Sequence, residues 1–174
     1  MEESIHTANV LHRLIVDDGT FPNNDRLPLL VYRGALELTG RNPARPVEDL
    51  FDAHHWFGAW RNGIFGYHHY HSTAHEVLGV YSGMARVQLG GEKGPEFEIR
   101  QGDVIVIPAG VAHKNLGSSR DFKVVGAYPG GQRYDMNYGK AGERPRADRN
   151  IANVSLPELD PVFGDSGPLI DLWH

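Results

Sequence analysis

The chain has 174 residues, no cysteine and a formal net charge of −5. The lack of cysteine excludes disulfides, thiolate ligands and cysteine nucleophiles, and the acidic balance argues against a nucleic-acid partner, which needs a basic surface. No run approaches the roughly 18 apolar residues of a membrane span, and the acidic N-terminus lacks a secretory signal segment. We therefore expect one cytoplasmic domain over residues 1–174, with no membrane partner.

Two extended apolar runs come first, over residues 8–16 and 27–33. An Asp-Asp-Gly turn at 17–19 ends the first run, and Pro28 places the second near the edge of a sheet. A strand ahead of a compact β fold can pair with a second copy of the chain. These runs therefore predict two strands and a homodimer that forms through the first of them.

Residues 46–57 are the best helix candidate. Pro46 suits the first helical position, apolar residues recur at the i, i+3, i+4 spacing of an amphipathic helix, and a glycine at position 58 would end it. We expect His54 to pack partly and His55 to face solvent, neither acting as a ligand. Trp56 and Trp60 are expected to be core or cap residues.

From Trp60 onward the pattern predicts short strands separated by Gly and Pro, which is typical of a sandwich or barrel. The segment after Tyr128, rich in Gly, Pro, Arg and Asp, is expected to wrap this barrel as irregular structure. Its basic residues around Arg144 are expected to lie in a solvated loop. The predicted strands are 64–71, 76–82, 84–89, 96–100, 103–107 and 122–128.

A histidine cluster precedes the second of these strands. His69 and His71 are two apart, so in a strand both imidazoles project from the same face. A turn at Ser72-Thr73 would form a hairpin and bring Glu76 beside them. Imidazole nitrogen and carboxylate oxygen are ligands for a divalent Fe, Mn, Ni, Co or Zn ion.

A second stretch, residues 102–113, predicts a buried strand, a tight turn and His113. Pro108 and Gly110 explain the reversal of the chain after the Val-Ile-Val-Ile run. His113 would begin the next strand. If that strand lies beside the His-Tyr-His segment, His113 completes the ligand set.

These two stretches resemble the two motifs of the cupin superfamily (RmlC-like jelly rolls). Position 117 is glycine where the second motif usually has asparagine, and Asn115 lies two residues nearer, so the role of Asn115 is open. Longer stretches, such as 75–83 and 125–129, are similar to the YjlB-like bacterial single-domain cupins. The matching motif positions are Gly63, His69, His71, Glu76, Gly83, Gly102, Pro108, Gly110 and His113.

The resemblance implies an all-β fold, a double-stranded β-helix with its barrel core at about 60–130, to which the residue pattern at 46–57 adds one short N-terminal helix. It also implies one mononuclear metal bound by His69, His71, Glu76 and His113. Burying three imidazoles and a carboxylate together would be costly without a cation, which supports the same interpretation.

Residues next to the ligands have open roles. Tyr67 shares the inward face of the His-x-His segment, where it either lines the pocket mouth or packs. His75 is either turned away or a rim residue that carries protons. The direction of Tyr128 on the last strand is undecided, and His68 and Tyr70 are expected to point outward.

These observations favour a metal-dependent enzyme that acts on a small molecule, of the dioxygenase or isomerase type. Glu76 is the candidate general base when it is not bound to the metal. The alternative is a non-catalytic cupin that binds a sugar or acid. A metal-free epimerase with a histidine base is disfavoured by the intact ligand set.

Overall fold

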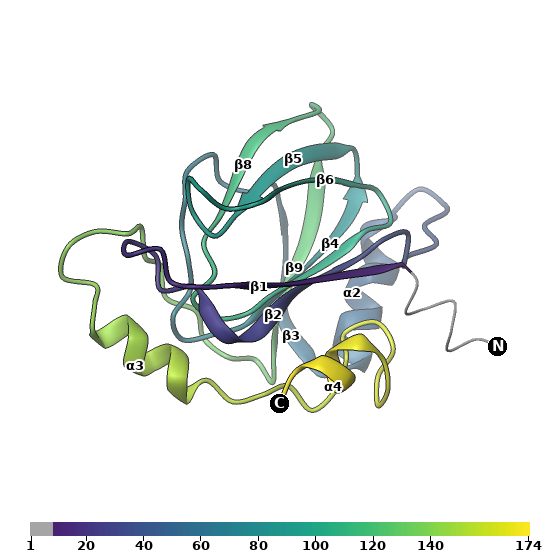
Figure 1. Ribbon diagram of the computed structural model, residues 1–174. Helices are drawn as coiled ribbons and strands as arrows, with labels where there is room; N and C mark the ends of the chain where they lie inside the picture. The colour runs from purple at the N-terminus through teal and green to yellow at the C-terminus, as the bar shows by residue number, and fades with distance from the viewer. Residues whose placement is uncertain (1–8) are drawn as a thin grey trace.

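The computed structural model describes residues 9–174. Residues 1–8 lie outside the described part. They include the N-terminus, in which no secretory signal was expected, and the first residue of the predicted strand 8–16. The strands form two antiparallel sheets that face each other (Figure 1). The larger sheet has the order β1-β2-β7-β4-β9-β3 and the smaller one β6-β5-β8. The strands are β1 (Val10–Ile15), β2 (Asn24–Tyr32), β3 (Trp56–Asn62), β4 (Glu76–Ser82), β5 (Met84–Leu89), β6 (Glu96–Arg100), β7 (Val104–Ile107), β8 (His113–Ser118) and β9 (Lys123–Pro129). The predicted all-β class is confirmed.

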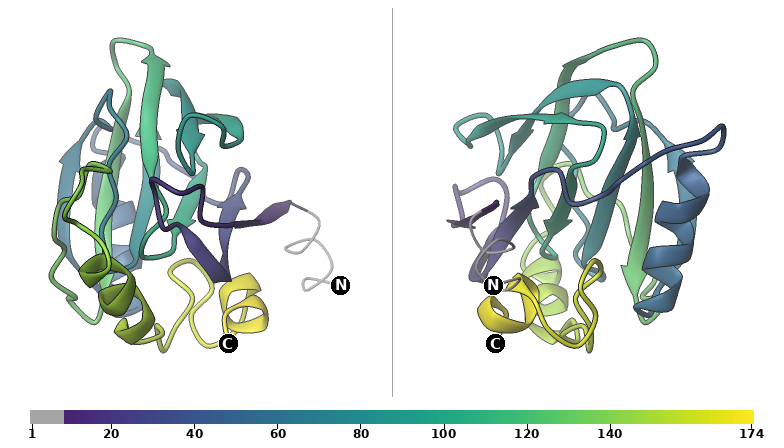
Figure 2. Two further views of the ribbon diagram at one scale, coloured as in Figure 1. Left: turned by 60° about the vertical axis from the view of Figure 1, so that its left-hand side comes forward. Right: turned by 90° about the vertical axis from the view of Figure 1, so that its right-hand side faces the viewer.

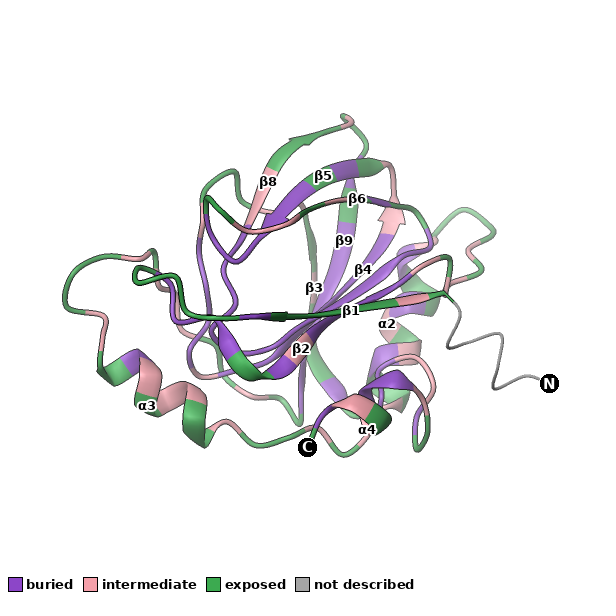
Figure 3. Ribbon diagram, viewed as in Figure 1, coloured by how far each residue is buried: buried purple, intermediate pink, exposed green. Residues whose placement is uncertain are grey.

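The central strands of the larger sheet are buried on both faces. Because side chains alternate along a strand, Leu78 of β4 joins the core between the two sheets, whereas Val77 packs outward under the helices. This explains β7, in which all four residues of the Val-Ile-Val-Ile run are buried. Figure 3 shows the central strands of the larger sheet mostly buried and β1 mostly exposed.

Helix α2 (Ala44–Ala53) covers the outer face of the larger sheet (Figure 2). It begins two residues before the predicted start, so Pro46 is its third residue. It also ends four residues earlier than predicted, because His54 caps it and His55 adopts a left-handed φ of 64°. The chain then enters β3, which the helical pattern had concealed.

The predicted strand over 64–71 is wrong. Of its residues, His69 and Tyr70 form isolated bridges, to His113 and Asn137. The expected hairpin with β4 is also wrong, since β4 pairs with β7 and β9. The other predicted strands of this region are confirmed, three with the same bounds and two within a residue at each end.

The C-terminal segment is less irregular than predicted. It contains α3 (Arg146–Asn153) and α4 (Pro168–Leu172). Leu169 of α4 joins the outer core, the apolar cluster between α2 and the outer face of the larger sheet that includes Phe51 and Val77. Arg144 forms ion pairs with Asp17 and Asp148, so it ties this segment to the N-terminal part instead of lying in a solvated loop. Within residues 9–174, no helix is long and apolar enough to span a bilayer.

Candidate metal centre

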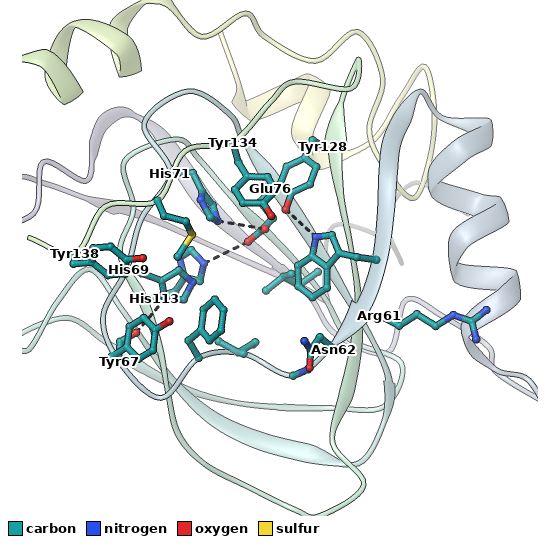
Figure 4. Close-up of a pocket in the computed structure, with 16 residues that line it drawn as sticks. Arg61, Asn62, Tyr67, His69, His71, Glu76, His113, Tyr128, Tyr134 and Tyr138 are labelled. Atoms are coloured by element: carbon teal, nitrogen blue, oxygen red, sulfur yellow. Dashed lines mark hydrogen bonds and ion pairs between the residues drawn. The ribbon is translucent and has the colours of Figure 1, made fainter. Parts of the chain in front are cut away.

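Three buried histidines converge between the sheets (Figure 4). His69 and His71 belong to the segment before β4, and His113 is the first residue of β8. Backbone hydrogen bonds in both directions join His69 to His113, at N···O distances of 2.9 and 3.2 Å. One ring nitrogen from each of the three lies within 4.8 Å of the others. The predicted proximity of the two motifs is therefore confirmed, through a bridge and not a hairpin.

Backbone carbonyls fix the tautomer of all three imidazoles. A carbonyl oxygen can only accept, so each Nδ1 carries a hydrogen, and in the neutral imidazole Nε2 keeps its lone pair. Where no metal is bound, a proton on Nε2 of His71 or His113 can take the place of the metal and bond to Glu76. Orientation of this kind is typical of histidines that bind a metal. The Nδ1–H groups donate to Tyr67 O from His69 at 3.0 Å, to Asp135 O from His71 at 2.6 Å and to Val111 O from His113 at 3.1 Å.

Glu76 faces two of these lone pairs. Its Oε2 lies 3.4 Å from Nε2 of His71, and its Oε1 lies 3.4 Å from Nε2 of His113. The carboxylate is buried, with 3 % of the residue exposed. Two acceptors at this distance repel each other unless a cation, either a proton or a metal ion, lies between them. The donor set therefore fits a divalent metal.

The protonation of the site follows from its charges. Burial alone would raise the pKa of Glu76, but the charge of His71 and hydrogen bonds from both histidines outweigh it and lower the pKa. Burial opposes the charging of His71, yet Glu76 raises its pKa. Burial and the nearby His113 lower the pKa of His69 to about 3. His69 is therefore neutral at pH 7, the form that binds a metal.

The ligand cluster lies at the base of an open pocket of about 500 Å³. Besides the four predicted ligands, its lining is mostly aromatic and aliphatic. These lining residues are Trp60, Arg61, Asn62, Gly63, Ile64, Phe65, Tyr67, Leu78, Tyr128, Tyr134, Met136 and Tyr138.

One wall of the pocket comes from a segment that the sequence did not point to. Tyr134, Met136 and Tyr138 line the pocket, while the residues between them face the opposite way. The Asp135 carboxylate accepts the backbone N–H of Ser72 at 2.6 Å and also its hydroxyl. The period of two in Tyr-x-Met-x-Tyr was the available signal, but the surrounding Gly and Pro obscured it.

The aromatic neighbours take defined positions. Tyr67 lines the pocket mouth, which was one of the two roles predicted for it. Tyr128 points into the pocket. Trp60 also lines the wall, where its Nε1–H donates to Tyr128 Oη at 2.8 Å, so the expectation of a core or cap role is incomplete. Trp56 is a core residue, as expected.

Other residues with open roles lie away from the pocket. His75 is buried against Trp173, and its Nδ1 accepts the N–H of Ala109 at 2.8 Å, so it is a core residue and not a rim proton carrier. His68 does not line this pocket. Tyr70 points away as expected, but it is fully buried beneath the C-terminal segment. Asn115 bonds to Gly117 and Ser118.

Comparisons with known proteins agree on the type of domain. Residues 61–125 match the family model described as the cupin domain. The uncharacterized protein YjlB of Bacillus subtilis (strain 168) is 47% identical over 157 residues, which are 90% of this chain and 92% of that protein.

Two solved structures show a weaker similarity to this chain. Acireductone dioxygenase from Bacillus anthracis, with a cadmium ion in its active centre, is 14% identical across 77% of this chain and 87% of its own, with a TM-score of 0.41. Pumpkin seed globulin is 27% identical across 46% of this chain, with a TM-score of 0.38, and the chain spans 22% of that globulin.

Proposed function

The chain belongs to the cupin family, and we propose that it is a metal-dependent enzyme of the dioxygenase or isomerase type that acts on a small molecule. The proposed centre is mononuclear, with His69, His71, Glu76 and His113 as ligands to a divalent Fe, Mn, Ni, Co or Zn ion. One observation carries this proposal: three imidazoles held in one tautomer aim their Nε2 lone pairs at a common point beside a buried carboxylate.

The chemistry divides between the ion and the side chains. When bound, a divalent ion supplies Lewis acidity and a template for a pair of substrate oxygens. Glu76 is the proposed general base when it is not bound to the metal, because among residues 9–174 it carries the one carboxylate that lines the pocket. Its pKa lies below the ordinary value, so it is charged and able to accept a proton at neutral pH.

Tyr128 and Trp60 have a proposed positioning role. The Trp60 N–H occupies one lone pair of Tyr128 Oη, which leaves the phenol hydrogen free to point toward Glu76 or a substrate oxygen. Burial raises the pKa of Tyr128, and the charge of Glu76 adds to the effect. Tyr128 therefore stays a neutral hydrogen-bond donor in the proposed site.

Elemental analysis of untagged protein, purified without added metal or chelator, tests the proposed centre. We expect about one equivalent of a divalent transition metal in the wild type and a large loss in His71→Ala and Glu76→Ala. His68→Ala is the matched control, because its imidazole is adjacent in sequence but outside the pocket. Equal occupancy in all variants would refute the ligand assignment, and a wild type that rejects added metals would refute the centre.

The identity of the metal directs the test of activity. Iron would lead to oxygen-consumption assays with diols and diketones, whereas zinc, nickel or manganese would lead to isomerase and hydrolase assays. A loaded protein that binds such compounds and leaves them unchanged would be a binding protein instead.

We also propose a homodimer through β1. Among the described residues, this strand pairs with β2 alone and forms an edge of the larger sheet. Leu11 and Leu14 on it are 47% and 48% exposed, and an unpaired apolar edge is a template for a second chain. Light scattering after size-exclusion chromatography should give twice the chain mass, and a monomer at micromolar concentration would contradict this.

A further inference from the structure

We propose that the substrate is an uncharged, planar aromatic or conjugated molecule that carries two adjacent oxygen atoms. This inference rests on the proposed function, because the oxygen pair is assigned to the metal centre. The part of the molecule beyond the oxygens is assigned from the lining of the pocket.

Exposed aromatic side chains are concentrated at the pocket mouth. Four of them, Phe65, Tyr67, Tyr134 and Tyr138, line the pocket while 41% to 51% of each residue is exposed. A ligand that covers such rings removes their apolar surface from water, which favours binding. Clusters of exposed apolar side chains of this kind mark binding sites. The mouth is therefore built to bind an apolar surface.

The rings form two stacked pairs on different sides of the histidines. Phe65 and Tyr67 stack with centroids 5.0 Å apart at an angle of 14°, and Phe65 lies 5.2 Å from His69. Tyr128 and Tyr134 stack at 5.0 Å and 22°, and Tyr134 lies 5.1 Å from His71. Figure 4 shows Tyr67 and the Tyr128–Tyr134 pair on opposite sides of the histidine cluster. A ligand bound at the histidine cluster would therefore have aromatic rings on either side of it.

The pocket offers no free cation to a charged substituent. Within residues 9–174, Arg61 is the one Lys or Arg that lines it. Its guanidinium donates to Glu48 and Asn42, and its side chain points away from the pocket (Figure 4). Lys140 lies over the ring of Tyr138, 5.1 Å from its centroid, and lines a neighbouring hollow. A carboxylate or phosphate beyond the metal would therefore be desolvated without a partner, which is costly.

The polar groups are also too few for a sugar. Among the described residues, the polar side chains that line the pocket apart from the proposed ligands, Arg61 and the tyrosine hydroxyls are Asn62 and Trp60, and the Trp60 N–H already donates to Tyr128. Several sugar hydroxyls would be left without partners, whereas a molecule of one or two rings would be covered by the aromatic pairs. The volume of about 500 Å³ lies within the range of small-molecule sites.

Three hydroxamates test this inference, because they share one chelating group and differ in the rest. We would titrate zinc-loaded protein calorimetrically with acetohydroxamate, benzohydroxamate and 4-carboxybenzohydroxamate. Stacking against two aromatic pairs predicts that benzohydroxamate binds at least about tenfold more tightly than acetohydroxamate. The added carboxylate should cancel most of that gain.

Variants assign the gain to the rings. Tyr134→Ala and Phe65→Ala should each reduce the preference for benzohydroxamate over acetohydroxamate to about threefold or less. Phe57→Ala is the matched control, since Phe57 is a similarly exposed ring outside this pocket, and it should retain the full preference.

The outcomes separate the two proposals. If acetohydroxamate binds but the aromatic group adds nothing, or if the carboxylate strengthens binding, the substrate class is wrong and the metal centre stands. If the protein takes up no zinc, the metal centre fails and the substrate class fails with it. If it takes up zinc but binds none of the three hydroxamates, the substrate class alone is wrong.

Discussion

Asp135 tests whether the segment over the pocket holds a metal ligand in place. Its backbone oxygen accepts the Nδ1–H of His71 at 2.6 Å. Its carboxylate accepts the N–H of Ser72, the residue that follows His71, at 2.6 Å. The Ser72 hydroxyl donates to the same carboxylate. The side chain thus connects the two segments that must stay in register for His71 to point at the centre. We predict that Asp135→Ala weakens both stability and metal affinity.

The expected magnitude follows from the donors left without a partner. Ser72 is fully buried, so the substitution removes the acceptor of a buried backbone N–H, which costs about 1–3 kcal/mol. The hydroxyl retains a hydrogen bond from Asn150 at 3.0 Å, so its loss is smaller. We expect a decrease of about 2–3 kcal/mol in the free energy of unfolding and a 10- to 100-fold weaker metal affinity, as is typical of outer-shell substitutions.

Urea unfolding of chelator-treated protein measures the first quantity, and competition for zinc with a chromophoric chelator measures the second. Asp135→Asn should lose less of each, because an amide oxygen still accepts the Ser72 N–H. Asp165→Ala removes an exposed aspartate elsewhere and should change neither. If Asp135→Ala is less stable but binds zinc as tightly as the wild type, Asp135 supports the fold alone and our reasoning about His71 is wrong.

Four further outcomes are expected. Asp160→Ala should lower the unfolding free energy in urea by about 3 kcal/mol, because the buried Tyr32 hydroxyl and three backbone N–H groups lose their acceptor; Tyr32→Phe should cost about 1 kcal/mol. Gly79→Ala should cost about 1–3 kcal/mol in the same assay, since its Cβ would lie 2.9 Å from the Phe51 ring. Zinc at 100 times its Kd should raise the unfolding free energy by about 2.7 kcal/mol, with no such gain in His71→Ala.

The strands from β4 to β9 were predictable because their signals are local. The run at 104–107 is apolar at every position, and a sheet covered on both faces produces that pattern. Glycines end the strands on either side, as at Gly83, which adopts a φ of 71°. Local pattern and tertiary environment coincide there, so the predicted bounds are close to the observed ones.

The end of α2 was not predictable in the same way. Helices usually end with a glycine in the left-handed region, and Gly58 offered that signal. The chain instead places His55 there, with a φ of 64°. The surrounding structure overrides the local preference, because the Trp56 side chain is needed in the outer core, where its Nε1–H donates to Leu159 O at 3.0 Å.

The candidate site was predicted in part. The spacing of the motifs identified which histidines would meet, but it gave a strand and hairpin where the structure has an isolated bridge from His69 to His113. The carbonyl of Asp135 that orients His71 could not be found, since it lies 64 residues away and any residue type supplies a carbonyl. Contacts made by the backbone at long range leave no mark on composition or periodicity.

The proposed ligands and the aromatic residues at the pocket mouth lie on different kinds of structural element. Glu76 and His113 are the first residues of β4 and β8, so the centre connects the larger sheet to the smaller one. Phe65 and Tyr134 instead lie on segments outside the strands and are exposed. Changes at the mouth therefore disturb few buried contacts, whereas changes at the base disturb both sheets. A scaffold of this kind can alter its substrate by substituting mouth residues while its metal chemistry stays the same.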